Sequence, residues 1–303
     1  MKKDLVTIAD LRAEEIAEIF ALTDELKKNK NKFSSSLKGK TLALLFQKPS
    51  NRTRVSFEVG MYQLGGYSIY ISAGEINLGV REAVKDVAKT LSRYVNGIVL
   101  RTFAHHNVLE LAKHASVPVI NGLSDYSHPC QALSDIYTVK EKLGVLKGKT
   151  LAYIGDGNNV CNSLLFAAAK TGLNMNVATP QGYEPEESVL KDAISLAKKS
   201  KAMIKLFGTA EEAAKGADVI YTDVWASMGK EKERGIRLKA FKAYQVNGKL
   251  VKGAKEDYIF MHCLPAHRGE EVTDEVADSE NSVIFDQAEN RLHTQKALLA
   301  LIL

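Results

Sequence analysis

The sequence LKGKTLALLF occupies residues 37–46, and its first seven residues recur in LKGKTLAYIG at residues 146–155. Each copy passes from a short basic turn into a continuous run of apolar residues. A strand buried on both faces of a sheet has this pattern, because neither face meets water. We therefore expect each copy to be the first strand of its own parallel sheet, with a second domain starting at residue 146.

Other short apolar runs follow each copy, with helical patterns between them. They lie at residues 67–71, 97–101, 117–120, 176–179, 219–223, 258–263 and 283–286. Parallel strands need long crossover connections, which helices supply. The sequence predicts an α/β protein with two doubly wound parallel-sheet domains, residues 1–145 and 146–288, and an active-site cleft between them. The last helix, residues 289–303, has an apolar end and is expected to pack back on the first domain.

The composition excludes several classes of protein. Of the 303 residues, 45% are hydrophobic and 25% charged, with 21 Gly and 6 Pro, which is close to the average for globular domains. The formal net charge of +5 is spread along the chain without a dense basic run. This charge favours a small anionic substrate and gives no indication of a nucleic-acid partner.

The cysteine content and the N-terminus bear on location. Three cysteines are an odd and sparse set, which is typical of a reducing compartment. The start MKKDLVTIADL lacks the apolar segment of a signal peptide, and no run approaches ~20 apolar residues. We expect a cytoplasmic protein with no membrane partner.

Polar residues follow most of the predicted strands, where open parallel sheets bind ligands. The stretch KPSNRTRVSFEVGMYQLGG, residues 48–66, begins with a Ser helix cap and ends at two glycines. Arg52 in the first turn opposes the helix dipole unless an anion lies nearby. A phosphate site is the functional interpretation, and a Ser cap with two solvated arginines is the alternative.

HPCQ, residues 128–131, offers a histidine donor and an amide at a predicted helix start. A histidine packed near a helix N-terminus is the alternative interpretation. His128, Cys130, His262 and Cys263 are all potential zinc ligands, but their spacing matches no common zinc pattern. No metal is predicted.

The second half of the chain has three further polar segments after strands. GDGNNV, residues 155–160, has Val160 where a dinucleotide fingerprint has its third Gly, so it favours an amino-acid carboxylate or a plain tight turn. Asp223 in DVWASMG can pair with an ammonium group or cap a helix. Cys263 is the last residue of the run at 258–263, where it could face a cleft or be buried in the core.

Taken in order, SNRTR, Arg101, HPCQ, GDGNN, DVWASMG, HCLPAHRGEEV and AENR resemble the aspartate/ornithine carbamoyltransferase superfamily over essentially the whole chain. SMG and HCLP point to the ornithine branch of that superfamily. Asn51 departs from the pattern, which commonly has Thr at this position. The resemblance implies substrates carbamoyl phosphate and L-ornithine, no cofactor and a homotrimer.

The resemblance also implies roles for individual residues. Carbamoyl phosphate would be held by Ser50, Asn51, Arg52, Thr53, Arg101, His128, Gln131, Cys263, Leu264 and Arg291. Ornithine would be held by Asn159, Asp223, Ser227 and Met228. Arg101, His128 and Cys263 would be the catalytic residues.

Three other functions are alternatives to this interpretation. A carbamoyltransferase for putrescine or an N-acylornithine would keep the fold and change the acceptor. A dinucleotide-dependent oxidoreductase needs the glycine that Val160 replaces. A binding protein without catalysis would have no reason to keep Arg52, Arg101 and His128 after strands.

Overall fold

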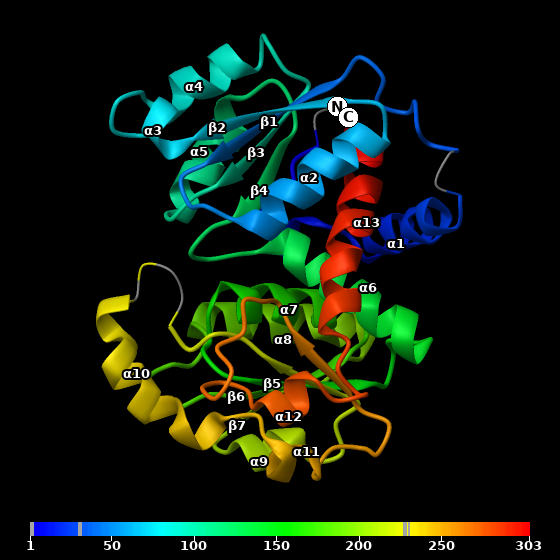
Figure 1. Ribbon diagram of the computed structural model, residues 1–303, viewed down its shortest axis with the longest axis vertical. Coiled ribbons are helices and arrows are strands. Elements are labelled where there is room, and N and C mark those ends of the chain that lie inside the picture. The colour runs from blue at the N-terminus through cyan, green and yellow to red at the C-terminus, as the bar shows by residue number, and fades with distance from the viewer. Residues whose placement is uncertain (1–2, 30–31, 227–228, 230) are drawn as a thin grey trace. The chain divides into compact units, whose positions relative to one another are not determined.

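A computed structural model describes residues 3–29, 32–226, 229 and 231–303. The chain divides into two compact units, Met1–Ser134 with Glu289–Leu303, and Asp135–Ala288 (Figure 1). Two helices contribute residues to both units, α6 (Pro129–Leu143) and α13 (Ile284–Ile302). Among the described helices, none is both long and apolar enough to cross a bilayer.

The first unit contains a four-stranded parallel sheet in the order β2-β1-β3-β4. Its strands are β1 (Thr41–Phe46), β2 (Tyr67–Ser72), β3 (Gly97–Arg101) and β4 (Val119–Leu123). One face packs on α4 (Val84–Leu91) and α5 (His105–His114), because the apolar side of each amphipathic helix needs a partner. Figure 1 shows α2 (Asn51–Gln63) and α13 on the other side, and the remaining helices are α1 (Ala13–Lys28) and α3 (Ala73–Ile76).

The second unit contains a five-stranded parallel sheet in the order β7-β6-β5-β8-β9. Its strands are β5 (Thr150–Ile154), β6 (Asn174–Ala178), β7 (Ile204–Phe207), β8 (Val219–Thr222) and β9 (Ile259–His262). The core on one face takes side chains from α9 (Ala210–Ala214), α11 (Gly248–Val251) and α12 (Asp274–Ala277). Figure 1 shows α7 (Asn159–Thr171) and α8 (Glu187–Ser200) on the opposite face, with α10 (Arg234–Phe241) beside the sheet. The predicted α/β class with two parallel sheets is confirmed.

Each sheet has one point where the strand order reverses. The chain runs from β1 outward to β2 and then returns to place β3 on the other side of β1. In the second unit it runs from β5 through β6 and β7, and then returns to place β8 beside β5. A crevice for ligands forms at such switch points, beyond the carboxyl ends of the two central strands. The segments after β1 and β3, and those after β5 and β8, are therefore the places to look for a site.

The two copies of the sequence repeat begin their strands in the same way. In the first copy, the Thr41 N–H donates to Asn96 Oδ1 at 2.9 Å and the Asn96 N–H donates to the Thr41 carbonyl. In the second, the Thr150 N–H donates to Asp218 Oδ2 at 2.9 Å and the Asp218 N–H donates to the Thr150 carbonyl. The residue just before the neighbouring strand thus closes a pair of hydrogen bonds with the first residue of β1 or β5.

The structure corrects the predicted strands in two places. The strand predicted at residues 283–286 is wrong, because α13 already begins at Ile284 and only Ser282 forms an isolated bridge, to Phe260. The apolar run VIF is buried partly as the first turn of that helix, and an apolar run this short fits either structure. Strand β7 was missed because its burial is partial on an edge of the sheet, so the segment IKLF has no continuous apolar pattern.

Candidate functional site

The N-terminus of α2 follows directly from the carboxyl end of β1. Ser50 has an extended backbone, and its hydroxyl accepts from the Thr53 N–H at 3.3 Å, as an N-cap does. Asn51 and Arg52 lie in the first turn, and Gly65, with φ of 84°, follows the end of the helix. The predicted start at Ser50 and stop at Gly65 are confirmed.

Arg291 of α13 forms hydrogen bonds to the first turn of α2 and to the first turn of α6. Its Nη2 donates to Thr53 Oγ1 at 3.2 Å, and its Nη1 donates to Gln131 Oε1 in the first turn of α6. Thr53, Gln131 and Arg291 are each at most 2% exposed. The structure thus brings together three predicted site residues from three helices.

Arg101 and His128 complete the group in the first unit. Arg101 is the last residue of β3, is paired in register with Phe46 of β1, and is buried. His128 immediately precedes α6 and is 6% exposed. Burial lowers the pKa of His128 well below its ordinary value, and the charges of Arg291, Arg101 and Arg52 lower it further. The imidazole is therefore neutral at neutral pH, in a region where three guanidinium groups concentrate positive charge.

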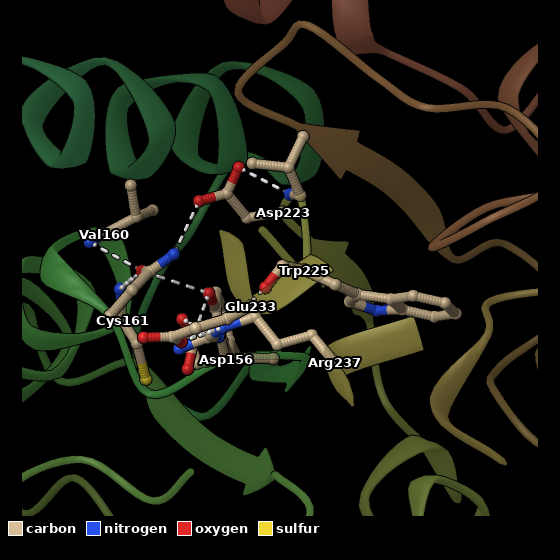
Figure 2. A network of polar contacts seen from close by, with 10 residues as sticks. Asp156, Val160, Cys161, Asp223, Trp225, Glu233 and Arg237 are labelled. Carbon is tan, nitrogen blue, oxygen red and sulfur yellow. Dashed lines mark hydrogen bonds and ion pairs between the residues drawn. The ribbon is translucent and has the colours of Figure 1, made fainter. Parts of the chain in front are cut away.

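Asp223 is the centre of the polar group in the second unit, directly after β8 (Figure 2). Its Oδ1 accepts from the Val224 N–H at 2.8 Å and from the Cys263 thiol at 3.0 Å. Its Oδ2 accepts from Asn158 Nδ2 at 2.8 Å. Asp223 is 6% exposed, so its carboxylate is fixed in orientation and largely removed from water.

The sequence analysis gives a role to Asn159 and none to its neighbour Asn158, which the structure shows in contact with Asp223. The Asn158 side chain accepts from the N–H groups of Val160 and Cys161, which makes it the N-cap of α7. Asn159 is the first residue of that helix and is partly exposed. Asn is a preferred cap residue, so the strand-turn-helix pattern of GDGNN could have indicated which of the two caps.

Cys263 and Leu264 follow β9 in the HCLP segment. Leu264 has a left-handed backbone with φ of 57°, which is uncommon for a residue with a branched side chain. Its N–H donates to His262 Nδ1 at 2.8 Å, while His262 Nε2 lies 3.2 Å from Glu271 Oε1. With Nδ1 accepting, Nε2 must carry the proton and donate to Glu271. The His262 and Glu271 side chains, both fully buried, thus hold the backbone of Leu264.

The possible metal ligands divide between the two units. Ligand atoms of Asp223, His262 and Cys263 lie within 4.8 Å of one another. In this arrangement His262 has no lone pair left for a metal, because Nδ1 accepts from Leu264. Burial raises the pKa of the Cys130 thiol in the first unit to about 12, so it is not a thiolate. These donors do not form a zinc site as they stand.

A second network missed in the sequence lies beside Asp223 (Figure 2). Arg237 of α10 donates through Nη1 to Asp156 Oδ2 and to the Trp225 carbonyl, both at 2.9 Å. Its Nε donates to Glu233, and its guanidinium lies 4.8 Å from the Tyr183 ring centroid. Arg237 belongs to a charged surface-like sequence, KEKERGIR, so nothing in the pattern indicates a residue that is 3% exposed.

Two predicted residues, Ser227 and Met228, lie outside the described residues. The other twelve fall into two groups. The first unit holds Ser50, Asn51, Arg52, Thr53, Arg101, His128, Gln131 and Arg291. The second holds Asn159, Asp223, Cys263 and Leu264. In each unit, one part of the group lies at the switch point, after β1 and β3 or after β5 and β8. Another part follows the edge strand, β4 or β9, and Arg291 is on α13.

This pair of parallel-sheet units, with a cationic group in one and a carboxylate-centred group in the other, matches a known class of two-domain transferases. Residues 3–141 match the model of the aspartate/ornithine carbamoyltransferase carbamoyl-P binding domain, and residues 147–302 match that of the Asp/Orn binding domain. The chain belongs to the aspartate/ornithine carbamoyltransferase family.

Individual relatives are similar over nearly their full length. An ornithine carbamoyltransferase of Thermococcus kodakarensis is 57% identical, over 99% of this chain and 96% of that protein. An anabolic ornithine carbamoyltransferase of Pyrococcus furiosus is 55% identical over the same shares. The solved structure of ornithine carbamoyltransferase from P. furiosus superposes with a TM-score of 0.96, covering 99% of this chain and 96% of that one.

Proposed function

We propose that this chain transfers the carbamoyl group of carbamoyl phosphate to the δ-amine of L-ornithine, giving L-citrulline and phosphate. The observation that carries this proposal is the gathering of Arg52, Arg101 and Arg291 around a neutral His128 at the start of α2. The names of the relatives at 55–57% identity supply the acceptor, ornithine.

The phosphate group of carbamoyl phosphate would lie at the N-terminus of α2. Backbone N–H groups there have no partner within the helix, and the helix dipole favours an anion. Ser50, Asn51, Arg52 and Thr53 line this first turn, and Arg101 at the end of β3 adds a second guanidinium. Since the backbone N–H of residue 51 makes the contact in this proposal, Asn serves there as well as Thr.

The carbamoyl group would lie toward Gln131, His128 and Arg291. A carbonyl oxygen accepts two hydrogen bonds, so Gln131 Oε1 can accept from a carbamoyl NH2 while it accepts from Arg291. A neutral His128 can donate to the carbamoyl carbonyl oxygen, as can Arg101. These donors would stabilise the negative charge that develops on that oxygen in the transition state.

Ornithine would be held by the second unit. The Asp223 carboxylate would pair with the α-ammonium group and Asn159 would bind the α-carboxylate, with Ser227 and Met228 contributing by resemblance to the family. Because the Cys263 thiol donates to Asp223, an ammonium group paired with that carboxylate would lie beside the sulfur. Leu264, next along the chain, would offer its backbone carbonyl to an amine hydrogen.

The reaction needs no covalent enzyme intermediate. The neutral δ-amine attacks the carbamoyl carbon, a C–N bond forms, and the C–O bond to phosphate breaks. The amine proton passes to the leaving phosphate, since no group of the site is assigned as a general base. Positioning of the two substrates and electrostatic stabilisation by Arg101, His128 and Thr53 supply the catalysis.

The acceptor can be tested directly. Carbamoyl transfer from carbamoyl phosphate to ornithine should be fast, and transfer to putrescine and N-acetylornithine should be slower by several orders of magnitude. Putrescine lacks the α-carboxylate that Asn159 would bind, and N-acetylornithine lacks the α-ammonium group that the buried Asp223 would bind. If putrescine or N-acetylornithine reacts as fast as ornithine, the assignment of ornithine as the acceptor is wrong. An absence of carbamoyl transfer to all three would overturn the proposal.

A surface of the first unit supports self-association into the homotrimer expected for the family. Strand β2 is the edge of its sheet and contacts α2. Tyr67 and Ile69 of β2 are 67% and 42% exposed, and Val55 and Tyr62 of α2 are 46% and 81% exposed. Exposed apolar side chains on two elements in contact are typical of an interface. Sedimentation analysis should give three chains, and Tyr67→Lys with Ile69→Lys should shift the population to monomer.

A cytoplasmic location is part of the same proposal. Cys130, Cys161 and Cys263 are all free thiols, as a reducing compartment would keep them.

A further inference from the structure

Gln295 lies one helical turn after Arg291 on α13 and accepts a hydrogen bond from it. The distance from Arg291 Nε to Gln295 Oε1 is 3.0 Å. Both side chains are buried, at 2% and 1% exposure. The spacing of four residues places them on the same face of the helix, so the contact follows from the helix geometry.

The amide group of Gln295 is itself fixed by α2. Its Nε2 donates to Ser56 Oγ at 2.9 Å, and the Ser56 hydroxyl lies 3.2 Å from the Thr53 carbonyl, to which it can donate. Thr53 Oγ1 in turn accepts from Arg291. Arg291, Gln295, Ser56 and Thr53 thus form a closed ring of hydrogen bonds between two helices.

This ring limits how the guanidinium group can turn. Nε points to Gln295, which leaves Nη1 and Nη2 directed to Gln131 and Thr53. A guanidinium group is a planar fork, so fixing one N–H fixes the direction of the others. These three acceptors are neutral oxygens, so none of them cancels the charge of the cation that it orients.

We infer that Gln295 is a positioning residue for carbamoyl phosphate: it orients Arg291 toward Gln131 and Thr53 without placing a negative charge beside the guanidinium group. This inference rests on the proposed role of Arg291, Gln131 and Thr53 in binding the carbamoyl side of that substrate. Gln295 itself touches neither substrate in this proposal.

Two substitutions of Gln295 distinguish a role in orienting Arg291 from a role in packing the two helices. Gln295→Glu keeps the size and the acceptor, but places a negative charge on the Arg291 guanidinium. Gln295→Leu removes the acceptor and keeps the volume approximately. If Gln295 only packed the two helices, Gln295→Glu would be the milder change, because it preserves the hydrogen bond to Arg291.

The inference predicts the opposite order for KM for carbamoyl phosphate: Gln295→Glu should raise it more than Gln295→Leu does. Gln295→Glu should raise KM for carbamoyl phosphate by about tenfold or more, because a carboxylate competes with the substrate for the charge of Arg291. Gln295→Leu should raise it less, by roughly threefold to tenfold, through loss of one oriented hydrogen bond. KM for ornithine should stay within about twofold of wild type in both.

The matched control is Thr294→Val. Thr294 is adjacent on α13 and 1% exposed, and its hydroxyl donates to the Asn290 carbonyl at 2.8 Å. This substitution removes a buried hydrogen bond that does not involve Arg291, and should leave KM for carbamoyl phosphate unchanged. Thermal unfolding of each variant checks that the protein measured is folded. If Gln295→Leu does not fold, the isosteric variant Gln295→Glu alone decides the test.

A wild-type KM for carbamoyl phosphate in folded Gln295→Glu overturns the inference. The variant Arg291→Met shows whether the inference about Gln295 is wrong or the proposed function itself is wrong. If Arg291→Met raises KM strongly while Gln295→Glu does not, the role of Gln295 is wrong and that of Arg291 stands. If neither variant changes KM, Arg291 does not bind the substrate and the proposed site is wrong at this position.

Discussion

Asn158 donates its amide N–H to the Asp223 carboxylate at 2.8 Å while its amide oxygen caps helix α7. One side chain therefore fixes both the helix start after β5 and the carboxylate after β8. Its neighbour Asn159, the first residue of that helix, is the residue that we assign to the α-carboxylate of ornithine. This division of roles underlies the first prediction.

Asn159→Ala should reduce kcat/KM for ornithine far more than for putrescine. Putrescine has no carboxylate for Asn159 to bind, but it keeps an ammonium group for Asp223. The ratio of the two specificity constants should fall by at least about tenfold. Parallel citrulline and carbamoylputrescine assays check this, and an unchanged ratio would remove Asn159 from the ornithine site.

Arg237→Gln should destabilise the protein strongly. Arg237 and Asp156 form an ion pair whose side chains are 4% and 6% exposed, so removing one partner leaves a buried charge. Breaking such a pair costs about 3–5 kcal/mol. Urea unfolding measures this, with Arg268→Gln as the control, because Arg268 pairs with Asp274 and Asp278 in exposed positions and should change stability little. Equal effects of the two substitutions would contradict the prediction.

Arg52→Ala should weaken carbamoyl phosphate binding with little change in the melting temperature. A charge-assisted contact to phosphate contributes about 1.5–3 kcal/mol, which corresponds to a rise in KM of about 10- to 150-fold. Stability should hold because Arg52 opposes the dipole of α2 in the free protein. Arg54→Ala is the matched control, since Arg54 pairs with Glu58 at 3.0 Å and stacks on Tyr70. Wild-type affinity in Arg52→Ala would exclude this helix end as the phosphate site.

His128 should contribute a pH-dependent part of the stability. Its pKa is lowered in the folded state by burial and by the charges of Arg291, Arg101 and Arg52. The unfolded chain therefore binds a proton that the folded chain does not, once the pH falls below about 6.5. Stability is complete above that value and should decline by ~1.4 kcal/mol per pH unit below it.

The comparison that isolates this contribution is His128→Asn against His106→Asn. His106 lies exposed on α5, so its replacement should leave the slope of stability against pH as it is. His128→Asn should flatten the slope between about pH 6.5 and 5. Identical slopes in the two variants would show that His128 titrates normally.

Activity toward ornithine should rise with pH, and the titration of a histidine should not appear in the profile. The reactive species is the neutral δ-amine, whose ammonium form has a pKa near about 10. The lowered pKa of His128 keeps the imidazole neutral throughout this range. kcat/KM for ornithine should therefore increase by close to tenfold per pH unit from about pH 7. A profile that is flat from about pH 7 to 9.5 would mean that the amine is not deprotonated on the enzyme as proposed.

The sequence predicted the two sheets because their strands are buried on both faces. Such strands have continuous apolar runs that stand out from their surroundings. Edge strand β7 lacks that signal, and the run at 283–286 has it but forms the start of α13. Apolar content alone indicates burial, and the choice between helix and strand then depends on tertiary contacts.

The same contrast holds for the site residues. The positions of Ser50, Arg101, His128 and Asp223 at the ends of strands could be predicted, because each ends or follows a recognisable apolar run. Gln295, Ser56 and Arg237 could not, since their roles arise from contacts between segments far apart in sequence, such as the 239 residues that separate Ser56 from Gln295. A polar residue inside a helix pattern gives no sign of its partner until the helices are packed together.

The hydrogen-bond pairs that start β1 and β5 differ in one chemical property. Asn96 carries an amide, which does not titrate, whereas Asp218 carries a carboxylate that also binds Lys255 at 2.7 Å and Lys149 at 3.0 Å. Burial acts to raise the pKa of Asp218, but its hydrogen bonds to Lys255, to the Thr150 N–H and to Lys149 outweigh burial and lower it. The stability that this carboxylate provides is therefore present above the ordinary carboxyl range and is lost as the pH falls through its folded-state pKa. Acid thus protonates the anchor of the second sheet and leaves that of the first unchanged, so the two halves of the duplicated motif differ in their resistance to acidification.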